Sequence, residues 1–147
     1  LQGMTREGEV LDLAADQIEF SYRESRFPQE LIILEARLRL KKDGPVGELI
    51  AQYLRRREEA QPLAAKSAGS VFKNPNGASA GKLIEEAGLK GLQIGGAQVS
   101  AKHANFIVNL GNASAEDVQS LISKVRERVR AETGVELEME IEVVGVA

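Results

Sequence analysis

The sequence predicts an α+β fold in two parts. A β-rich segment over residues 1–44 precedes an α+β domain over residues 45–147, in which helices cover a small sheet. Three observations support this prediction. Before residue 44, apolar and polar residues alternate, as in strands. After it, apolar residues recur at helical spacing. Between the two lies the turn sequence Lys41-Lys42-Asp43-Gly44-Pro45.

Three strands are predicted in the first segment. Residues 10–13 follow a Glu7-Gly8 turn, and residues 18–22 alternate apolar with polar side chains. Residues 31–40 form the strongest pattern. One face of this strand would carry Leu34, Ala36, Leu38 and Leu40, and the other Glu35, Arg37 and Arg39.

The second segment alternates helices and strands. The first helix spans residues 47–60, with an apolar face formed by Leu49, Ile50, Tyr53 and Leu54. Ser79 caps a short helix that stops at Gly88. Residues 106–108 form a short buried strand, and a helix runs from the Ser114/Asp117 capping box to Gly134. Alternating residues 135–143 predict a last strand.

The composition excludes several function classes. At 43% hydrophobic and 28% charged residues, the 147-residue chain is typical of globular proteins. Its net charge of −3 gives no general attraction to nucleic acid, and no apolar run predicts a membrane span. Without cysteine it forms no disulfide. His103 is the one histidine, and no ligand spacing accompanies it, so no metal site is expected. The first residues resemble a chain already under way rather than a signal peptide.

The run Gly69-Ser70-Val71-Phe72-Lys73-Asn74-Pro75 is the most informative feature of the chain. A glycine permits close approach to a ligand, and a proline ends regular structure. Between them stand a candidate proton donor, Ser70, a candidate phosphate-binding cation, Lys73, and the two-way hydrogen-bonding amide of Asn74. The alternative is a polar loop with one buried Phe.

Other motifs allow structural readings. A phosphate loop is not supported by the run Gly77-Ala78-Ser79-Ala80-Gly81-Lys82-Leu83. Its two glycines are separated by three residues instead of four, and Leu83 stands where Ser or Thr would hold magnesium. The glycine-rich run 88–98 is either a pair of turns or a loop that brings Lys90 to an anionic ligand. His103 is expected to make a structural hydrogen bond. Glu140 is one of four glutamates on one face of the last predicted strand, and exposure of that face to solvent is sufficient to account for them.

Six motifs in register resemble the UDP-N-acetylenolpyruvoylglucosamine reductase family of bacterial flavoenzymes. They are Tyr22-Arg23-Glu24-Ser25-Arg26-Phe27, residues 69–75, residues 81–91, residues 95–100, residues 103–109 and Leu137-Glu138-Met139-Glu140. The resemblance covers nearly the whole chain but only the C-terminal half of the family's enzyme. The short spacing between Tyr22 and Gly69 is similar to the compact type, which lacks an extra substrate-covering loop.

This resemblance implies a domain organisation and a reaction. Residues 1–44 would be the end of the second FAD-binding domain, and residues 45–147 the substrate-binding domain. The whole enzyme would use NADPH to reduce UDP-N-acetylenolpyruvoylglucosamine to UDP-N-acetylmuramate, a peptidoglycan precursor, in the bacterial cytoplasm. The missing N-terminal half would make most of the contacts to FAD. We therefore expect the isolated chain to bind FAD weakly or not at all.

The resemblance also implies roles for seven residues. Ser70 would donate the proton, and Arg23 would stabilise the substrate carboxylate as it becomes enolate-like. Glu140 matches the third active-site residue, and as a carboxylate it would help only if protonated or paired with Arg23. The UDP and diphosphate would be held by Tyr22, Arg57, Asn74 and Lys90, although Arg57 has two arginines beside it.

Two hypotheses remain open from the sequence. The chain is part of the flavin-dependent reductase and brings its catalytic serine, arginine and glutamate, or it acts alone as a nucleotide-sugar-binding module without catalysis. Yellow purified material with a flavin absorption band favours the reductase. Colourless protein that binds a UDP-sugar favours the module.

Overall fold

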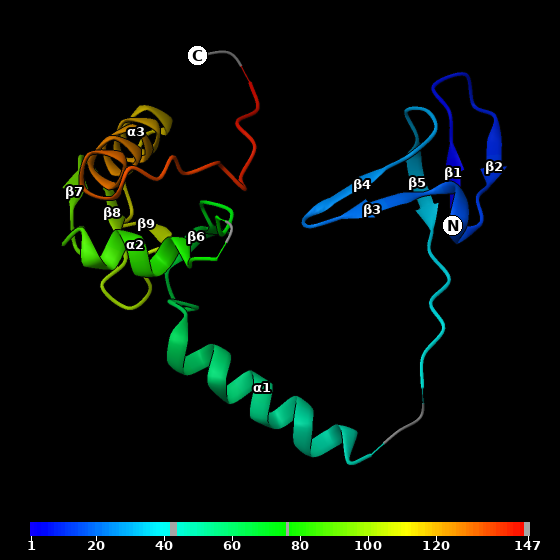
Figure 1. Ribbon diagram of the computed structural model, residues 1–147, viewed down its shortest axis with the longest axis horizontal. Coiled ribbons are helices and arrows are strands. Elements are labelled where there is room, and N and C mark those ends of the chain that lie inside the picture. The colour runs from blue at the N-terminus through cyan, green and yellow to red at the C-terminus, as the bar shows by residue number, and fades with distance from the viewer. Residues whose placement is uncertain (42–43, 76, 146–147) are drawn as a thin grey trace. The chain divides into compact units, whose positions relative to one another are not determined.

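The computed structural model describes residues 1–41, 44–75 and 77–145, and its fold is α+β, as predicted (Figure 1). The chain forms two compact units, Leu1–Gly44 and Pro45–Ala147. Lys42 and Asp43 of the predicted turn lie outside the described residues. Each unit is described by itself below.

The unit Leu1–Gly44 contains a three-stranded sheet and a separate hairpin. The antiparallel sheet has the order β2-β1-β5, formed by β2 (Val10–Asp12), β1 (Gln2–Met4) and β5 (Ile32–Glu35). The short 3-10 helix η1 (Ala15–Gln17) leads to the hairpin of β3 (Glu19–Ser21) and β4 (Glu24–Arg26). The predicted strands at 10–13 and 18–22 are therefore confirmed, whereas β1 and β4 were not predicted.

The predicted strand over residues 31–40 is wrong beyond Glu35. β5 ends at Glu35, which pairs with Gln2 of β1. Within the described residues, nothing continues the ladder past that pair. Leu38 and Leu40 are 79% and 83% exposed, so the alternation that predicted a strand does not bury its apolar face in this unit.

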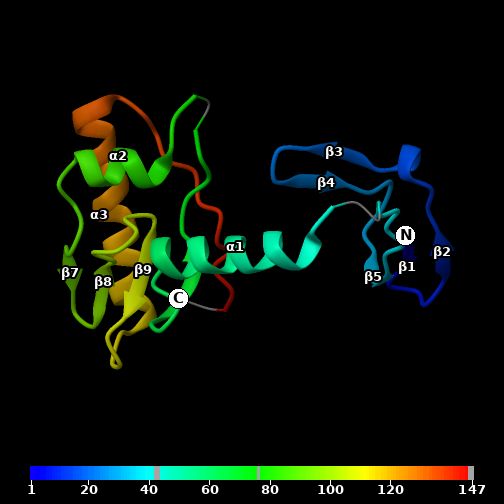
Figure 2. The same ribbon diagram turned by 90° about the horizontal axis from the view of Figure 1, so that it is seen from below.

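The unit Pro45–Ala147 is built on a four-stranded antiparallel sheet. Its strand order is β6-β9-β8-β7, formed by β6 (Lys66–Ser70), β9 (Phe106–Asn109), β8 (Ala97–Val99) and β7 (Gln93–Ile94). Helix α3 (Ala115–Thr133) packs on β7 and β8, and α2 (Ala80–Glu86) packs on α3. In Figure 2, α3 lies behind β8 and β9, with α2 across one end. β9 confirms the predicted strand at 106–108.

The core of this unit lies between the sheet and the two helices. Its most deeply buried large side chains are Ile84, Val99, Leu121, Val125, Val129 and Leu137. Burial of each such side chain stabilises the fold by about 1.5–3 kcal/mol. This core holds β6 and the loop after it, where the candidate site lies.

Both predicted helix caps are present. The Ser79 Oγ atom accepts the Lys82 N–H at the start of α2, and Ser114 forms a capping box with Asp117 at the start of α3. α3 ends at Gly134, whose φ of 73° suits glycine. Asp117 also accepts the Gly96 N–H, which ties α3 to the turn between β7 and β8.

Helix α1 (Val46–Ala60) confirms the predicted helix but not the burial of its apolar face. Leu49, Ile50, Tyr53 and Leu54 are all exposed. Lys102 donates a hydrogen bond to the Glu58 carbonyl, so the last turn of α1 meets the loop before β9. No helix in the described ranges has the length and apolarity needed to cross a bilayer.

The predicted strand over residues 135–143 is wrong. The segment forms a single antiparallel bridge, between Met139 and Phe72, and joins none of the sheets. Leu137 is fully buried, but Met139 and Val143 are 37% and 52% exposed. The segment lies beside residues 71–73, where its hydrogen bonds serve a loop rather than a ladder.

Candidate functional site

Ser70 lies at the end of β6, where the strand leaves its regular ladder. β6 pairs with β9 at Ser67↔Val108 and again at Ser70↔Phe106, with a register shift between them. Gly69, in the shifted stretch, has a φ of 87°, a conformation that L side chains rarely adopt. The irregularity leaves Ser70 half-buried at the start of the loop.

The segment Val71–Lys73 lies between two other parts of the chain. On one side, the Val71 N–H donates to the Asn105 carbonyl (2.8 Å). On the other, the Glu140 N–H donates to the Val71 carbonyl (2.8 Å), and the Lys73 N–H donates to the Glu138 carbonyl (2.9 Å). Lys73 and Glu138 also form an ion pair. The loop after Ser70 therefore has a defined backbone position.

Glu140 bonds through its backbone to the residue that follows Ser70. Ser70 precedes Val71, and Glu140 bonds to the Val71 carbonyl. Glu140 is half-buried, and its Oε2 atom is buried. Strand alternation predicted a solvated face for Glu140, whereas its backbone bonds to Val71, the residue after Ser70, and its side chain is half-buried.

Asn105 is a residue of this site that sequence reasoning did not select. It is only 4% exposed. Its Oδ1 atom accepts the Phe72 N–H (3.0 Å), and its Nδ2 atom donates to the Phe72 carbonyl (2.8 Å). The available signal was an amide directly before the apolar run Phe106-Ile107-Val108, where a buried polar side chain requires partners.

Asn74 connects the Ser70 loop to α2. Its Oδ1 atom accepts the N–H of Ala80, the first residue of the helix (3.0 Å). Within the described residues, its Nδ2 group has no hydrogen-bond partner. The oxygen therefore has a structural role, while the amide N–H groups can serve the ligand role predicted for Asn74.

Lys90 forms an ion pair with Glu85 of α2, with Nζ and Oε1 2.7 Å apart. Its side chain is about one-third exposed. Burial lowers the pKa of His103, and the Lys90 ammonium contributes in the same direction. Lys90 thus lies near the loop before β9 that carries His103 and Asn105.

His103 has the structural role expected from the sequence. Its Nδ1 atom accepts the Asn105 N–H (3.2 Å), and its ring meets Phe106 edge to face, with centroids 4.9 Å apart. A Cβ placed on Gly81 would lie 3.1 Å from His103 Cε1, so glycine permits this close packing of α2.

Arg57 occupies the last turn of α1 and is exposed. Its Nε atom donates to Gln61 Oε1 (3.2 Å). The next residue, Glu58, receives the hydrogen bond from Lys102, which lies beside His103 in the chain. Arg57 therefore lies one residue from the point where α1 meets the loop before β9, the hydrogen bond between Glu58 and Lys102.

Tyr22 and Arg23 form the tip of the β3–β4 hairpin in the unit Leu1–Gly44. Arg23 has a φ of 63°, uncommon for a residue with a side chain. Its guanidinium lies over the Tyr22 ring, 5.8 Å from the centroid, and Tyr22 is 62% exposed. The other five predicted site residues belong to Pro45–Ala147.

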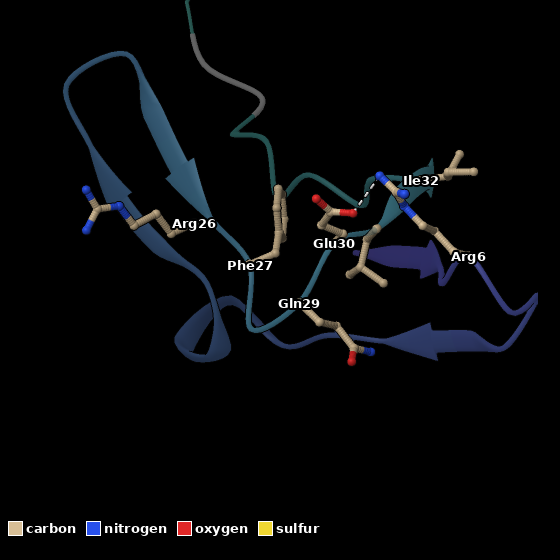
Figure 3. Close-up of a pocket in the computed structure, with 7 residues that line it drawn as sticks. Arg6, Arg26, Phe27, Gln29, Glu30 and Ile32 are labelled. Atoms are coloured by element: carbon tan, nitrogen blue, oxygen red, sulfur yellow. Dashed lines mark ion pairs between the residues drawn. The ribbon is translucent and has the colours of Figure 1, made fainter.

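A pocket of about 650 Å³ in the unit Leu1–Gly44 was not predicted. Figure 3 shows the Arg6–Glu30 ion pair, with Nη2 and Oε2 2.8 Å apart, among the side chains that line it. Arg26, also in the lining, pairs with Glu24. Its lining is Arg6, Arg26, Phe27, Gln29, Glu30, Leu31 and Ile32.

Comparison with known proteins identifies the family. The profile of the UDP-N-acetylenolpyruvoylglucosamine reductase C-terminal domain matches residues 61–144. Among curated relatives, the reductase of Gluconobacter oxydans is 45% identical over 97% of this chain and 47% of its own length. That of Caldicellulosiruptor saccharolyticus is 50% identical over 92% of this chain and 46% of its own length.

A solved structure agrees in fold. The crystal structure of the reductase MurB from Thermus caldophilus has a TM-score of 0.78 and 42% identity, covering 96% of this chain and 51% of that one. The chain thus spans about half the length of the relatives it matches. It belongs to the UDP-N-acetylenolpyruvoylglucosamine reductase family, in which it corresponds to the C-terminal half.

Proposed function

We propose that this chain supplies the C-terminal half of a bacterial, cytoplasmic reductase that converts UDP-N-acetylenolpyruvoylglucosamine to UDP-N-acetylmuramate for peptidoglycan synthesis. The observation that carries the proposal is the placement of Ser70 and Glu140 around Val71 in a chain of this family. Residues 1–44 are, in this proposal, the end of a flavin-binding domain, and residues 45–147 the substrate-binding domain.

FAD, reduced by NADPH, supplies the hydride of the reaction when it is bound. The glycine-rich start of α2 does not fit a flavin diphosphate. The Ala80 N–H already donates to Asn74, the Lys82 N–H donates to Ser79, and Gly81 lies against His103. We therefore assign flavin binding mainly to the part of the relatives that this chain does not span.

Reduction of an enolpyruvyl group requires a proton at the α-carbon as well as hydride at the β-carbon. Ser70 donates this proton from Oγ. Serine is a weak acid, but a carbon that carries developing negative charge is a strong enough base to take its proton. Arg23 stabilises the charge that spreads onto the carboxylate, through two parallel N–H groups.

Glu140 assists as the neutral acid or as a partner of Arg23, since a bare carboxylate would oppose the developing negative charge. Lys90, Arg57, Asn74 and Tyr22 hold the UDP and diphosphate groups. A diphosphate requires local cations here, because the chain has a net charge of −3.

The test uses the full-length protein that contains this chain. After reduction by NADPH, its flavin should be reoxidised by UDP-N-acetylenolpyruvoylglucosamine, and mass spectrometry should find UDP-N-acetylmuramate. If the substrate leaves the reduced flavin unchanged and no product forms, the proposal fails. Tight UDP-sugar binding without turnover would instead support the nucleotide-sugar-binding module.

A further inference from the structure

We propose that Asn105 is a positioning residue that holds the Ser70 loop in the geometry required for proton transfer. This inference rests on the proposed function for its catalytic part. Asn105 is separated from Phe72 by 33 positions in the chain, yet it makes three hydrogen bonds to the two residues that follow Ser70.

The first argument concerns where the β6–β9 ladder ends. Ser70 pairs with Phe106, and the Val71 N–H bonds to the Asn105 carbonyl. At that point the segment before β9 turns away from β6, because the Phe106 N–H donates to the His103 carbonyl in a tight turn. The next backbone groups on the Ser70 side, those of Phe72, would therefore lose their strand partner.

The side chain of Asn105 takes the place of that partner. A primary amide offers one acceptor and donor hydrogens, as a peptide group does. Asn105 accepts from the Phe72 N–H and donates to the Phe72 carbonyl, at 3.0 and 2.8 Å. Both groups belong to a residue that is only 2% exposed, so water cannot readily replace the amide as their partner.

Asn105 is itself held from two sides. Its N–H donates to His103 Nδ1 (3.2 Å), and its Cβ atom lies 3.6 Å from the position of a Cβ on Gly81. The imidazole therefore holds the backbone of Asn105, and the absence of a side chain on Gly81 leaves room for Asn105 beside α2.

The position of Val71 matters because its backbone bonds to two segments that flank the Ser70 loop. Its N–H bonds to Asn105 and its carbonyl bonds to Glu140. A shift of Val71 and Phe72, whose side chains belong to the buried core, would move the neighbouring Ser70. Misplacement of a reacting group by about 1 Å can reduce a rate about 100-fold.

The experiment compares Asn105→Asp and Asn105→Ala with the wild type in the full-length protein. The aspartate is nearly isosteric but cannot donate to the Phe72 carbonyl. Val129→Ala is the control, because Val129 is fully buried on α3 and its loss destabilises the core. Stopped-flow absorbance measures flavin reduction by NADPH and reoxidation by the enolpyruvyl substrate, the latter also in D₂O.

We expect Asn105→Asp to slow reoxidation by about 10–100-fold and to increase its solvent isotope effect, since proton transfer becomes limiting. Reduction by NADPH should stay within about threefold of wild type, because the proton donor takes no part in it. Val129→Ala should lower the melting temperature yet keep reoxidation near the wild-type rate. If Asn105→Asp reoxidises as fast as Val129→Ala, the inference is wrong.

Hydrogen exchange at the Phe72 amide separates this inference from the proposed function. Exchange that is faster in Asn105→Ala, which removes both bonds to Phe72, than in wild type supports the positioning of the loop, even in a protein that does not reduce the substrate. Equal protection in both proteins overturns it. A wild-type protein that the substrate never reoxidises overturns the proposed function and the catalytic part of the inference.

Discussion

The Nδ1 atom of His103 accepts the backbone N–H of Asn105 at 3.2 Å. An imidazole nitrogen can accept only when it carries no proton, so the native structure requires the neutral ring with its proton on Nε2. Protonation of His103 would break the bond that supports Asn105. The lone histidine, which the sequence assigned to a structural role, thus contributes to the residues that hold the Ser70 loop.

The first prediction concerns the titration of His103. Burial is the largest cause that lowers its pKa from 6.5, and the Lys90 ammonium adds to the effect. A hydrogen bond to the His103 backbone and the Glu85 carboxylate raise this pKa, but by less. An NMR titration, simplified by the single histidine of this chain, should give a pKa below 6.5, and Lys90→Ala should raise it. A pKa above 6.5 would contradict the described packing.

The same shift makes stability depend on pH. Above pH 6.5, the ring is neutral in both the folded and unfolded states. As the pH falls below that value, the unfolded state binds a proton first, so the free energy of unfolding should decrease until the lower folded pKa is passed. Chemical denaturation at several pH values should show this decrease in the wild type, and His103→Gln should reduce it.

The second prediction concerns Ser70. In the full-length protein, Ser70→Ala should slow flavin reoxidation by the enolpyruvyl substrate at least ~100-fold, because the proton donor is lost. Reduction by NADPH should remain nearly intact, and Ser70→Cys should retain more activity than Ser70→Ala. Ser67→Ala is the matched control, since Ser67 lies on the same strand and is exposed. A wild-type reoxidation rate in Ser70→Ala would reduce Ser70 to a loop residue.

The third prediction concerns Lys90. Lys90→Ala should weaken UDP-sugar binding by about 1–3 kcal/mol, as expected for a charge-assisted hydrogen bond, and added salt should shrink the difference. The melting temperature should change little, because an ion pair at a partly exposed site contributes about 0–1 kcal/mol. Isothermal titration calorimetry with UDP-N-acetylglucosamine provides the measurement.

Lys124→Ala controls for the loss of a lysine in an ion pair. Lys124 pairs with Glu127 on α3, with Nζ and Oε2 3.1 Å apart. Its substitution should leave UDP-sugar binding unchanged. If Lys90→Ala and Lys124→Ala bind the nucleotide sugar equally well, Lys90 forms only its surface pair with Glu85.

The fourth prediction concerns the turn between β7 and β8. A Cβ on Gly96 would lie 2.4 Å from the Ala113 backbone nitrogen, a contact that only backbone movement can relieve. Gly96→Ala should therefore lower the melting temperature clearly. At Gly47, in the first turn of α1, a Cβ meets nothing within 4 Å, so Gly47→Ala should have little effect. Equal melting temperatures for the two variants would show that the turn readily relaxes.

Local chemistry in the sequence was sufficient for the helices and their ends. The caps at Ser79 and Ser114 and the C-terminal Gly134 are present as predicted, since each acts within one turn of chain. The motif at residues 69–75 also identified the loop that the structure holds between Asn105 and Glu140. The roles of the seven site residues remain predictions.

Only the tertiary structure decided where the alternating segments lie. Residues 31–40 and 135–143 have the same strand-like pattern, yet one ends at Glu35 and the other makes a single bridge to Phe72. Alternation reports which side chains could share a face, but a strand also needs a neighbour whose N–H and C=O groups are available. That neighbour is chosen by contacts between residues far apart in the chain. For the same reason, the sequence alone could not select Asn105, whose amide acquires its role only from a backbone 33 positions away.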